Sequence, residues 1–182
     1  MRLENSFRVP APPEEAWKLL NDVPAVVPCM PGAELTEVVG ENAWKAKLYV
    51  KLGPIALQFL ADVAREEIDE TRGRVLLTVK AREGKGRGSA DATIESRLAP
   101  VGGGTHVHIA TELALRGAVA QYGRGVVADV AGRLTEQFAR CIAAKLAETP
   151  AAAAPVAAPA PVGGLRLLFG AFWRSLFRRS RK

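Results

Sequence analysis

Apolar and polar side chains alternate along successive segments between residues 44 and 115, and this pattern constrains the fold more than any other feature. A period of two is typical of β-strands with one buried and one exposed face. The alternating segments are residues 44–51, 55–63, 75–81, 90–98 and 107–115, and a shorter candidate strand precedes them at residues 3–9. Polar or glycine-rich turns separate the segments, including residues 66–73 and 102–104. The pattern predicts an antiparallel sheet that is covered on one face only.

A helical period replaces this alternation after the last strand. Apolar residues recur every three or four positions from Gln121 to Glu148, which predicts a helix of about 28 residues, or about 42 Å. Two prolines and two glutamates at positions 12–15 predict the start of a short helix after the first strand. We therefore expect an α+β helix-grip fold over residues 1–148, in which a curved antiparallel sheet wraps around a long C-terminal helix.

Small side chains recur at positions that should face one another across the sheet and the long helix. They are Ala46, Ala61, Ala81, Ala90 and Ala92 on the strands and Ala128 and Gly132 on the helix. Such positions leave room for an apolar cavity, although close packing of small residues is the alternative. The expected ligand-binding residues are Leu57, Phe59, Leu77, Val79, Ala92, Tyr122, Val126 and Val130. Among these, Tyr122 is the expected hydrogen-bond donor to a ligand carbonyl.

The C-terminal part of the chain differs in composition from the rest. Residues 149–164 are rich in alanine and proline, which favours an extended, flexible linker. Residues 165–182 carry an apolar stripe of helical period, six cations and no acid. Because these six belong to a total of 25 basic residues, the rest of the chain has 19 basic and 19 acidic side chains. The basic character of the protein therefore belongs to its tail.

This amphipathic tail helix is predicted to bind an anionic membrane surface. Its stripe covers about 20 Å of helix, which is too short for a hydrocarbon core of about 30 Å, so it should lie in the interface. The expected membrane-binding residues are Phe169, Phe172, Trp173, Leu176 and Phe177, with Arg174, Arg178 and Arg179 facing lipid headgroups. A partner groove, or docking on the chain's own domain, are the alternatives. Nucleic acid is not expected as a partner, since nucleic-acid-binding arms carry cations without a continuous apolar stripe.

No catalytic or metal-binding residues are predicted, and the chain is not expected to be an enzyme. His106 and His108 share a strand face with Glu112, but this face is opposite the apolar one and should be solvated. The segment GKGRGS at 84–89 lies in a hairpin instead of before a helix, so it is a turn and not a phosphate loop. Cys29 and Cys141 are expected to be incidental thiols. Candidate enzyme-docking cations are Lys45, Lys47, Lys51, Lys85 and Arg87.

Four stretches carry a resemblance to a known family: residues 16–38, 50–63, 84–95 and 103–117, with CMPG at 29–32 and VKLGPI at 50–55 as their most specific segments. They resemble the family of the carbon monoxide dehydrogenase G subunit, within the START-like (SRPBCC) superfamily. The resemblance implies a non-enzymatic accessory protein of a molybdenum hydroxylase such as carbon monoxide dehydrogenase. It also implies attachment of that enzyme to the membrane and electron transfer through a bound quinone, menaquinone or ubiquinone, without a covalent cofactor.

The absence of a signal-peptide pattern predicts a cytoplasmic protein that attaches peripherally to the inner face of the cell membrane. Two other functions stay open. A START-like cyclase or hydrolase acting on an aromatic substrate would need an ionisable group that points into the cavity. A membrane tether without a ligand would have a close-packed interior instead. Fold alone does not separate these classes.

Overall fold

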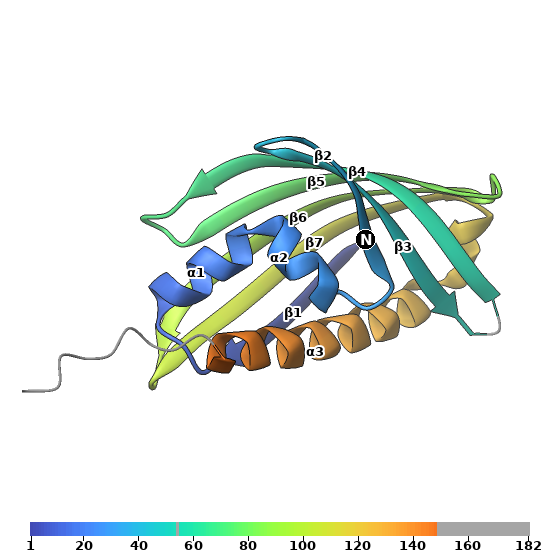
Figure 1. Ribbon diagram of the computed structural model, residues 1–182. Coiled ribbons are helices and arrows are strands. Elements are labelled where there is room, and N and C mark those ends of the chain that lie inside the picture. The colour runs from blue at the N-terminus through green and yellow to red at the C-terminus, as the bar shows by residue number, and fades with distance from the viewer. Residues whose placement is uncertain (54, 149–182) are drawn as a thin grey trace, which may run out of the picture. The chain divides into compact units, whose positions relative to one another are not determined.

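The computed structural model describes residues 1–53 and 55–148, and in it a seven-stranded antiparallel sheet curves over one long helix (Figure 1). The strand order is β1-β7-β6-β5-β4-β3-β2. The strands are β1 (Arg2–Val9), β2 (Ala33–Gly40), β3 (Ala43–Leu52), β4 (Ile55–Asp69), β5 (Arg74–Glu83), β6 (Gly88–Val101) and β7 (Gly104–Gly117). Apart from the pairing of β1 with β7, each strand pairs with its neighbour in sequence, as hairpins do.

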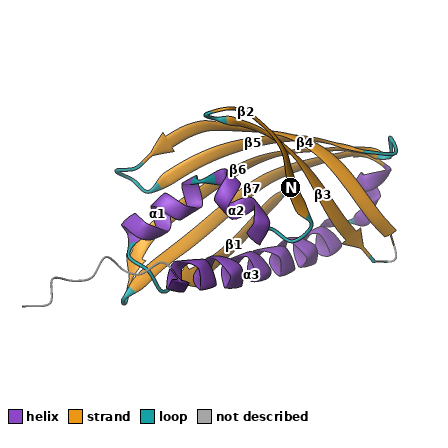
Figure 2. Ribbon diagram, viewed as in Figure 1, coloured by secondary structure: helices purple, strands orange, loops and turns teal. Residues whose placement is uncertain are grey.

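The helices fall into two groups that both lie on the concave face of the sheet (Figure 2). The helices α1 (Pro13–Asn21), α2 (Val23–Val26) and η1 (Val27–Cys29) lie between β1 and β2, and η2 (Ala118–Tyr122) and α3 (Arg124–Glu148) follow β7. As predicted, α1 starts with a proline and has two glutamates in its first turn. The predicted α+β helix-grip fold is confirmed.

The buried core consists of two separate clusters. The first surrounds the C-terminal half of α3 and includes Val9, Ala16, Cys29, Phe138, Ile142 and Leu146. The rings of Phe7 and Phe138 meet edge to face there, with centroids 6.0 Å apart. The second cluster lies toward η2 and contains Leu57, Phe59, Ala81 and Val119. All buried residues of α3 belong to its C-terminal half, so that half anchors the helix.

The structure contains one strand that was not predicted and differs from the prediction at two boundaries. The strand β2 was not predicted, because it is mostly exposed and two register shifts interrupt its alternation. The predicted turn at 66–73 is too long, since β4 continues to Asp69. A bulge between Arg65 and Glu67 shifts the alternation of β4 by one residue, so the residues after the bulge do not continue the pattern that predicts the first part of the strand. The long helix begins at Arg124, because Gly123 has a positive φ of 62° that ends η2.

Cys29 and Cys141 are not incidental thiols, since they form a disulfide with a Cα–Cα distance of 5.3 Å. The two residues are 112 positions apart, and a separation of this length does not indicate a contact. Folding brings η1 against α3 within the first buried cluster, and this places the two sulfur atoms together. The disulfide therefore fastens η1 to the C-terminal half of the long helix.

The predicted linker at 149–164 and tail at 165–182 lie outside the described residues. The same holds for the proposed membrane-binding side chains, which are Phe169, Phe172, Trp173, Arg174, Leu176, Phe177, Arg178 and Arg179. Within the described part of the chain, no helix combines the length and the apolarity that crossing a membrane requires.

Candidate functional site

Between the two buried clusters, the concave face of the sheet is apolar but only half-buried. Val63, Val79, Ala92 and Leu113 are neighbours across β4, β5, β6 and β7. The next row of the sheet contains Leu77, Ile94 and Thr111. All seven are partly exposed although they face the helical side of the domain, and we call them the central trough. A filled core would bury such central positions most deeply.

The path of the long helix explains why the central trough is not filled. The backbone of α3 comes closest to β1, and it also approaches β3, η1 and α1 (Figure 1). Its side chains in the N-terminal half are half-buried at best, including Val127, Val130, Ala131 and Leu134. A half-buried apolar surface between two closed clusters can accept an apolar ligand.

Of the small strand residues expected to leave room for a cavity, Ala92 lies in the central trough, and the others lie one row away from it. Ala46, Ala61, Ala81 and Ala90 form a single row across β3 to β6. Three of these alanines belong to the second buried cluster or pack against it, together with Val119, Tyr122 and Val130. Close packing against η2 and α3 therefore accounts for much of this row. The central trough begins one row further along the sheet.

The predicted ligand-binding residues divide into three groups. Leu77, Val79 and Ala92 belong to the central trough. Leu57 and Phe59 are buried members of the second cluster, and Tyr122 and Val130 pack against that cluster half-buried. Val126 is 43% exposed at the start of α3. The structure thus places three of the eight side chains in the trough, of which Val79 also packs against the second cluster, and four others in or beside that cluster.

One ionisable side chain that the sequence analysis did not single out, Glu83, points inward at the end of β5, and its side chain is only 1% exposed. Its carboxylate accepts hydrogen bonds from the Arg87 guanidinium at 2.8 Å and from the backbone N–H groups of Lys85 and Arg87 at 2.9 and 3.1 Å. These bonds, led by the one from the Arg87 side chain, lower the pKa of Glu83 from 4.5 to about 2. Because a general acid or base needs a pKa near the working pH, Glu83 is suited to holding the hairpin and not to catalysis.

A second inward charge that the sequence analysis missed is Arg65, near the C-terminal end of α1. It lines a small cavity of about 40 Å³ together with Leu20, Asn21, Val23, Val75, Leu77, Ser96 and Leu98. The strand periodicity held a signal for both charges, since Arg65 follows the inward Val63 by two positions and Glu83 follows the inward Ala81 by two. Every second residue of a strand faces inward whether it is polar or apolar, so the period of two also predicts that Arg65 and Glu83 face inward.

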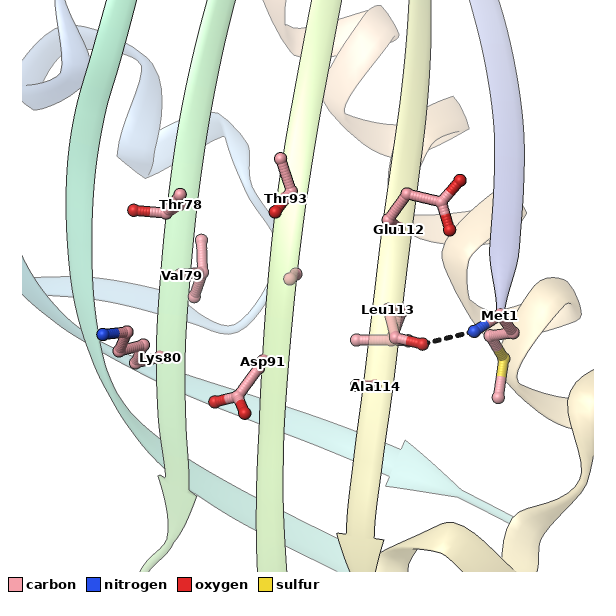
Figure 3. A pocket seen from close by; sticks show the side chains of 10 residues that line it. Met1, Thr78, Val79, Lys80, Asp91, Thr93, Glu112, Leu113 and Ala114 are labelled. Atoms are coloured by element: carbon pink, nitrogen blue, oxygen red, sulfur yellow. Dashed lines mark hydrogen bonds between the residues drawn. The ribbon is translucent and has the colours of Figure 1, made fainter.

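The convex face of the sheet carries an open hollow over β5, β6 and β7, with a volume of about 370 Å³ (Figure 3). Thr78, Lys80, Asp91 and Glu112 border it, and Val79, Ala92 and Leu113 of the trough strands also line it. The N-terminal amine of Met1 donates a hydrogen bond to the backbone oxygen of Leu113 at 2.5 Å. Because this hollow is open to solvent and three charged side chains border it, it is less suited to an apolar ligand than an enclosed site would be.

The predicted surface histidines and cations also lie outside the trough. The imidazole of His108 lies 3.9 Å from the Glu4 carboxylate. No cluster of His, Cys, Asp and Glu within the described residues could hold a metal ion. Of the docking candidates, Lys45 pairs with Glu37 at 2.8 Å, which raises the pKa of Lys45 through that hydrogen bond. Arg87 is committed to Glu83 and to the backbone oxygen of Ala56. Lys47, Lys51 and Lys85 have no such side-chain pairing in the described part of the chain.

A curved seven-stranded antiparallel sheet that wraps around a long C-terminal helix defines the helix-grip fold. Solved structures share this fold. A conserved protein from Geobacillus kaustophilus has a TM-score of 0.72 and 23% identity, covering 81% of this chain and 95% of that one. A Thermus thermophilus protein has a TM-score of 0.57 and 15% identity, with coverages of 80% and 99%. The Zhui aromatase/cyclase from Streptomyces sp. R1128 has a TM-score of 0.57 and 14% identity, with coverages of 81% and 93%.

The family itself follows from the sequence. The sequence model of the CoxG family, described as the G subunit of carbon monoxide dehydrogenase, matches residues 6–147, which is most of the chain. The protein belongs to this family. Among curated proteins, none matches the chain.

Proposed function

We propose that this protein is a non-enzymatic accessory protein of a molybdenum hydroxylase of the carbon monoxide dehydrogenase type. In this proposal it holds a hydrophobic, quinone-like ligand in the central trough and links the enzyme to the membrane. The observation that carries the proposal is the half-buried apolar surface between two closed clusters, at Ala92, Ile94 and their neighbours. Membership of the CoxG family supports the choice of partner.

The membrane part of the proposal rests on the sequence of the tail. An apolar stripe with six cations matches an interfacial helix, and the Ala/Pro linker gives it reach from the domain. Each cation near an anionic surface contributes about 1 kcal/mol, and added salt weakens this attraction. We place the protein at the cytoplasmic face of the cell membrane. The disulfide argues in the other direction, since cytosolic cysteines are usually reduced. The state of this pair in cells is therefore a direct test of the location.

An enzyme acting on an aromatic substrate is the second candidate. Two observations favour it: an ionisable group, Glu83, does point inward, and one protein of similar fold is an aromatase/cyclase. Against it, the pKa of Glu83 is about 2 and its oxygens already accept three hydrogen bonds, so it has no proton to donate near neutral pH. The carrier function is therefore the better supported of the two.

The experiment combines the full chain with the carbon monoxide dehydrogenase of its own organism and with liposomes that contain menaquinone. Reduction of the quinone under carbon monoxide should accelerate when the full chain is added. Ala92→Phe, which fills the trough, should abolish the acceleration, whereas Thr93→Val on the opposite face of the same strand should not. Equal rates with and without the protein would refute the carrier function.

A further inference from the structure

We infer that the small cavity between α1 and β4–β6 receives the oxygen-bearing end of the ligand, with Arg65 and Ser96 as its hydrogen-bond partners. This inference rests on the proposed function, because it assumes a ligand in the central trough. It adds an orientation: the polar end lies by α1, and the apolar remainder runs along the trough toward η2. Tyr122, the partner expected from the sequence, belongs to the opposite end.

The size and position of the cavity fit this role. Leu77 lines the cavity and belongs to the central trough, so the two spaces adjoin. The cavity measures about 40 Å³. A bound water needs roughly 10–15 Å³ on the same kind of measure. The cavity therefore has room for an oxygen and the atoms that carry it, but not for a ring or a long chain, which must remain in the trough.

Arg65 supplies a positive charge that lacks an acidic partner. Its Nε donates to Asn42 Oδ1 at 2.9 Å, and its two terminal nitrogens donate to the backbone oxygens of Asn21 and Glu41 at 3.1 Å each. The guanidinium also lies 5.3 Å from the ring centroid of Trp44. Of its five N–H groups, two remain unused by these bonds, and no ion pair joins it to a carboxylate within the described part of the chain.

Ser96 supplies a second polar group in the same cavity. It lies on the concave face of β6, between Val75 of β5 and Ile109 of β7. Its hydroxyl is half-buried and makes no hydrogen bond to any described residue. A polar group in an apolar wall gains from a partner that protein atoms do not provide here. A ligand oxygen can accept from this hydroxyl and from the free N–H groups of Arg65.

These two groups define the chemical class of the ligand. A fixed guanidinium with spare donors favours an oxygen of high electron density, such as a ring carbonyl, an enolate or a carboxylate. A cationic ligand is disfavoured by the same charge, and a pure hydrocarbon would leave both donors without a partner. A quinone and a fatty acid share the favoured chemistry, so the test includes both.

The test measures the affinity of the full chain for a short-chain menaquinone and for palmitate by equilibrium dialysis. Ser96→Val fills the cavity and removes the hydroxyl without breaking any hydrogen bond of the fold. Thr93→Val on the convex face of the same strand is the matched control. Arg65→Lys keeps the positive charge but replaces the planar guanidinium, with its five N–H donors, by a single ammonium group. We expect Ser96→Val to weaken binding of at least one probe about tenfold, Arg65→Lys to weaken the same probe, and Thr93→Val to leave both unchanged.

The outcomes separate this inference from the proposed function. Selective loss of menaquinone identifies a quinone site, selective loss of palmitate identifies a fatty-acid site, and loss of both supports the shared chemistry. If Ser96→Val binds both probes as well as the unmodified chain, the polar end lies elsewhere and the inference is overturned while the trough survives. If the unmodified chain binds neither probe, the proposed function fails as well. The thermal unfolding temperature of Arg65→Lys shows whether loss of the hydrogen bond to the backbone oxygen of Asn21 destabilises the fold.

Discussion

Removing the disulfide should lower the stability of the domain by a large part of its total. The perturbation is Cys29→Ser with Cys141→Ser in the full chain, compared with the oxidised, unmodified protein. The bond closes a loop between residues 112 positions apart. The chain-entropy estimate for a loop of this length is about 16 cal/mol/K, or about 5 kcal/mol at 25 °C. Measured losses for native disulfides are about 2–5 kcal/mol, and small domains have only about 5–15 kcal/mol in all.

The assay is urea unfolding followed by tryptophan fluorescence. With a slope of about 2 kcal/mol/M, a loss of 2–5 kcal/mol moves the midpoint down by roughly 1–2.5 M. The reduced, unmodified chain should unfold at nearly the same urea concentration as the double variant, and reductant should not change the double variant. A double variant as stable as the oxidised chain would refute this expectation, because the two sulfurs would then not be constraining the unfolded state.

Three further changes have outcomes that the structure specifies. Glu83→Gln should destabilise the domain more at pH 7 than at pH 3. The pKa of Glu83 in the folded protein is lowered from 4.5 to about 2, so the stabilisation that its carboxylate provides is complete above about pH 4.5 and disappears as the pH falls toward 2. Urea unfolding midpoints at the two pH values measure this difference. Ala92→Phe should fill the central trough and weaken menaquinone binding at least tenfold with little loss of thermal stability, whereas a large drop in the melting temperature would mean that the trough is already filled. Ending the chain at Gly164 should leave a folded domain that no longer sediments with anionic liposomes, and retention of binding would place the membrane site elsewhere.

The sequence predicted the fold well because the two periodicities that define it are strong. Alternation in residues 44–51 and 90–98 matches β3 and β6, and the helical period matches α3 apart from its first residues. The missed strand β2 is an exposed edge, where burial does not impose alternation. The disulfide could not be predicted, because the approach of η1 to α3 depends on tertiary packing and not on spacing.

The candidate site was predicted only in part. Leu77, Val79 and Ala92 were placed in the trough because their inward direction follows from strand period. The path of α3 along β1 decides which inward-facing residues of the sheet are left half-buried. No local pattern in the sequence determines that path. Arg65 and Ser96 also lie at inward strand positions, but they are polar, so a pattern of apolar residues does not reveal them.

The sharpest test of the carrier function is to find out what occupies the trough in the protein as cells make it. The full chain would be purified from its own organism without detergent and extracted with organic solvent, and the extract analysed by mass spectrometry. A carrier should yield a quinone at a substantial fraction of one molecule per chain, and a much lower amount from Ala92→Phe prepared in the same way. An extract that contains no quinone, or equal amounts from the two proteins, would contradict the carrier function.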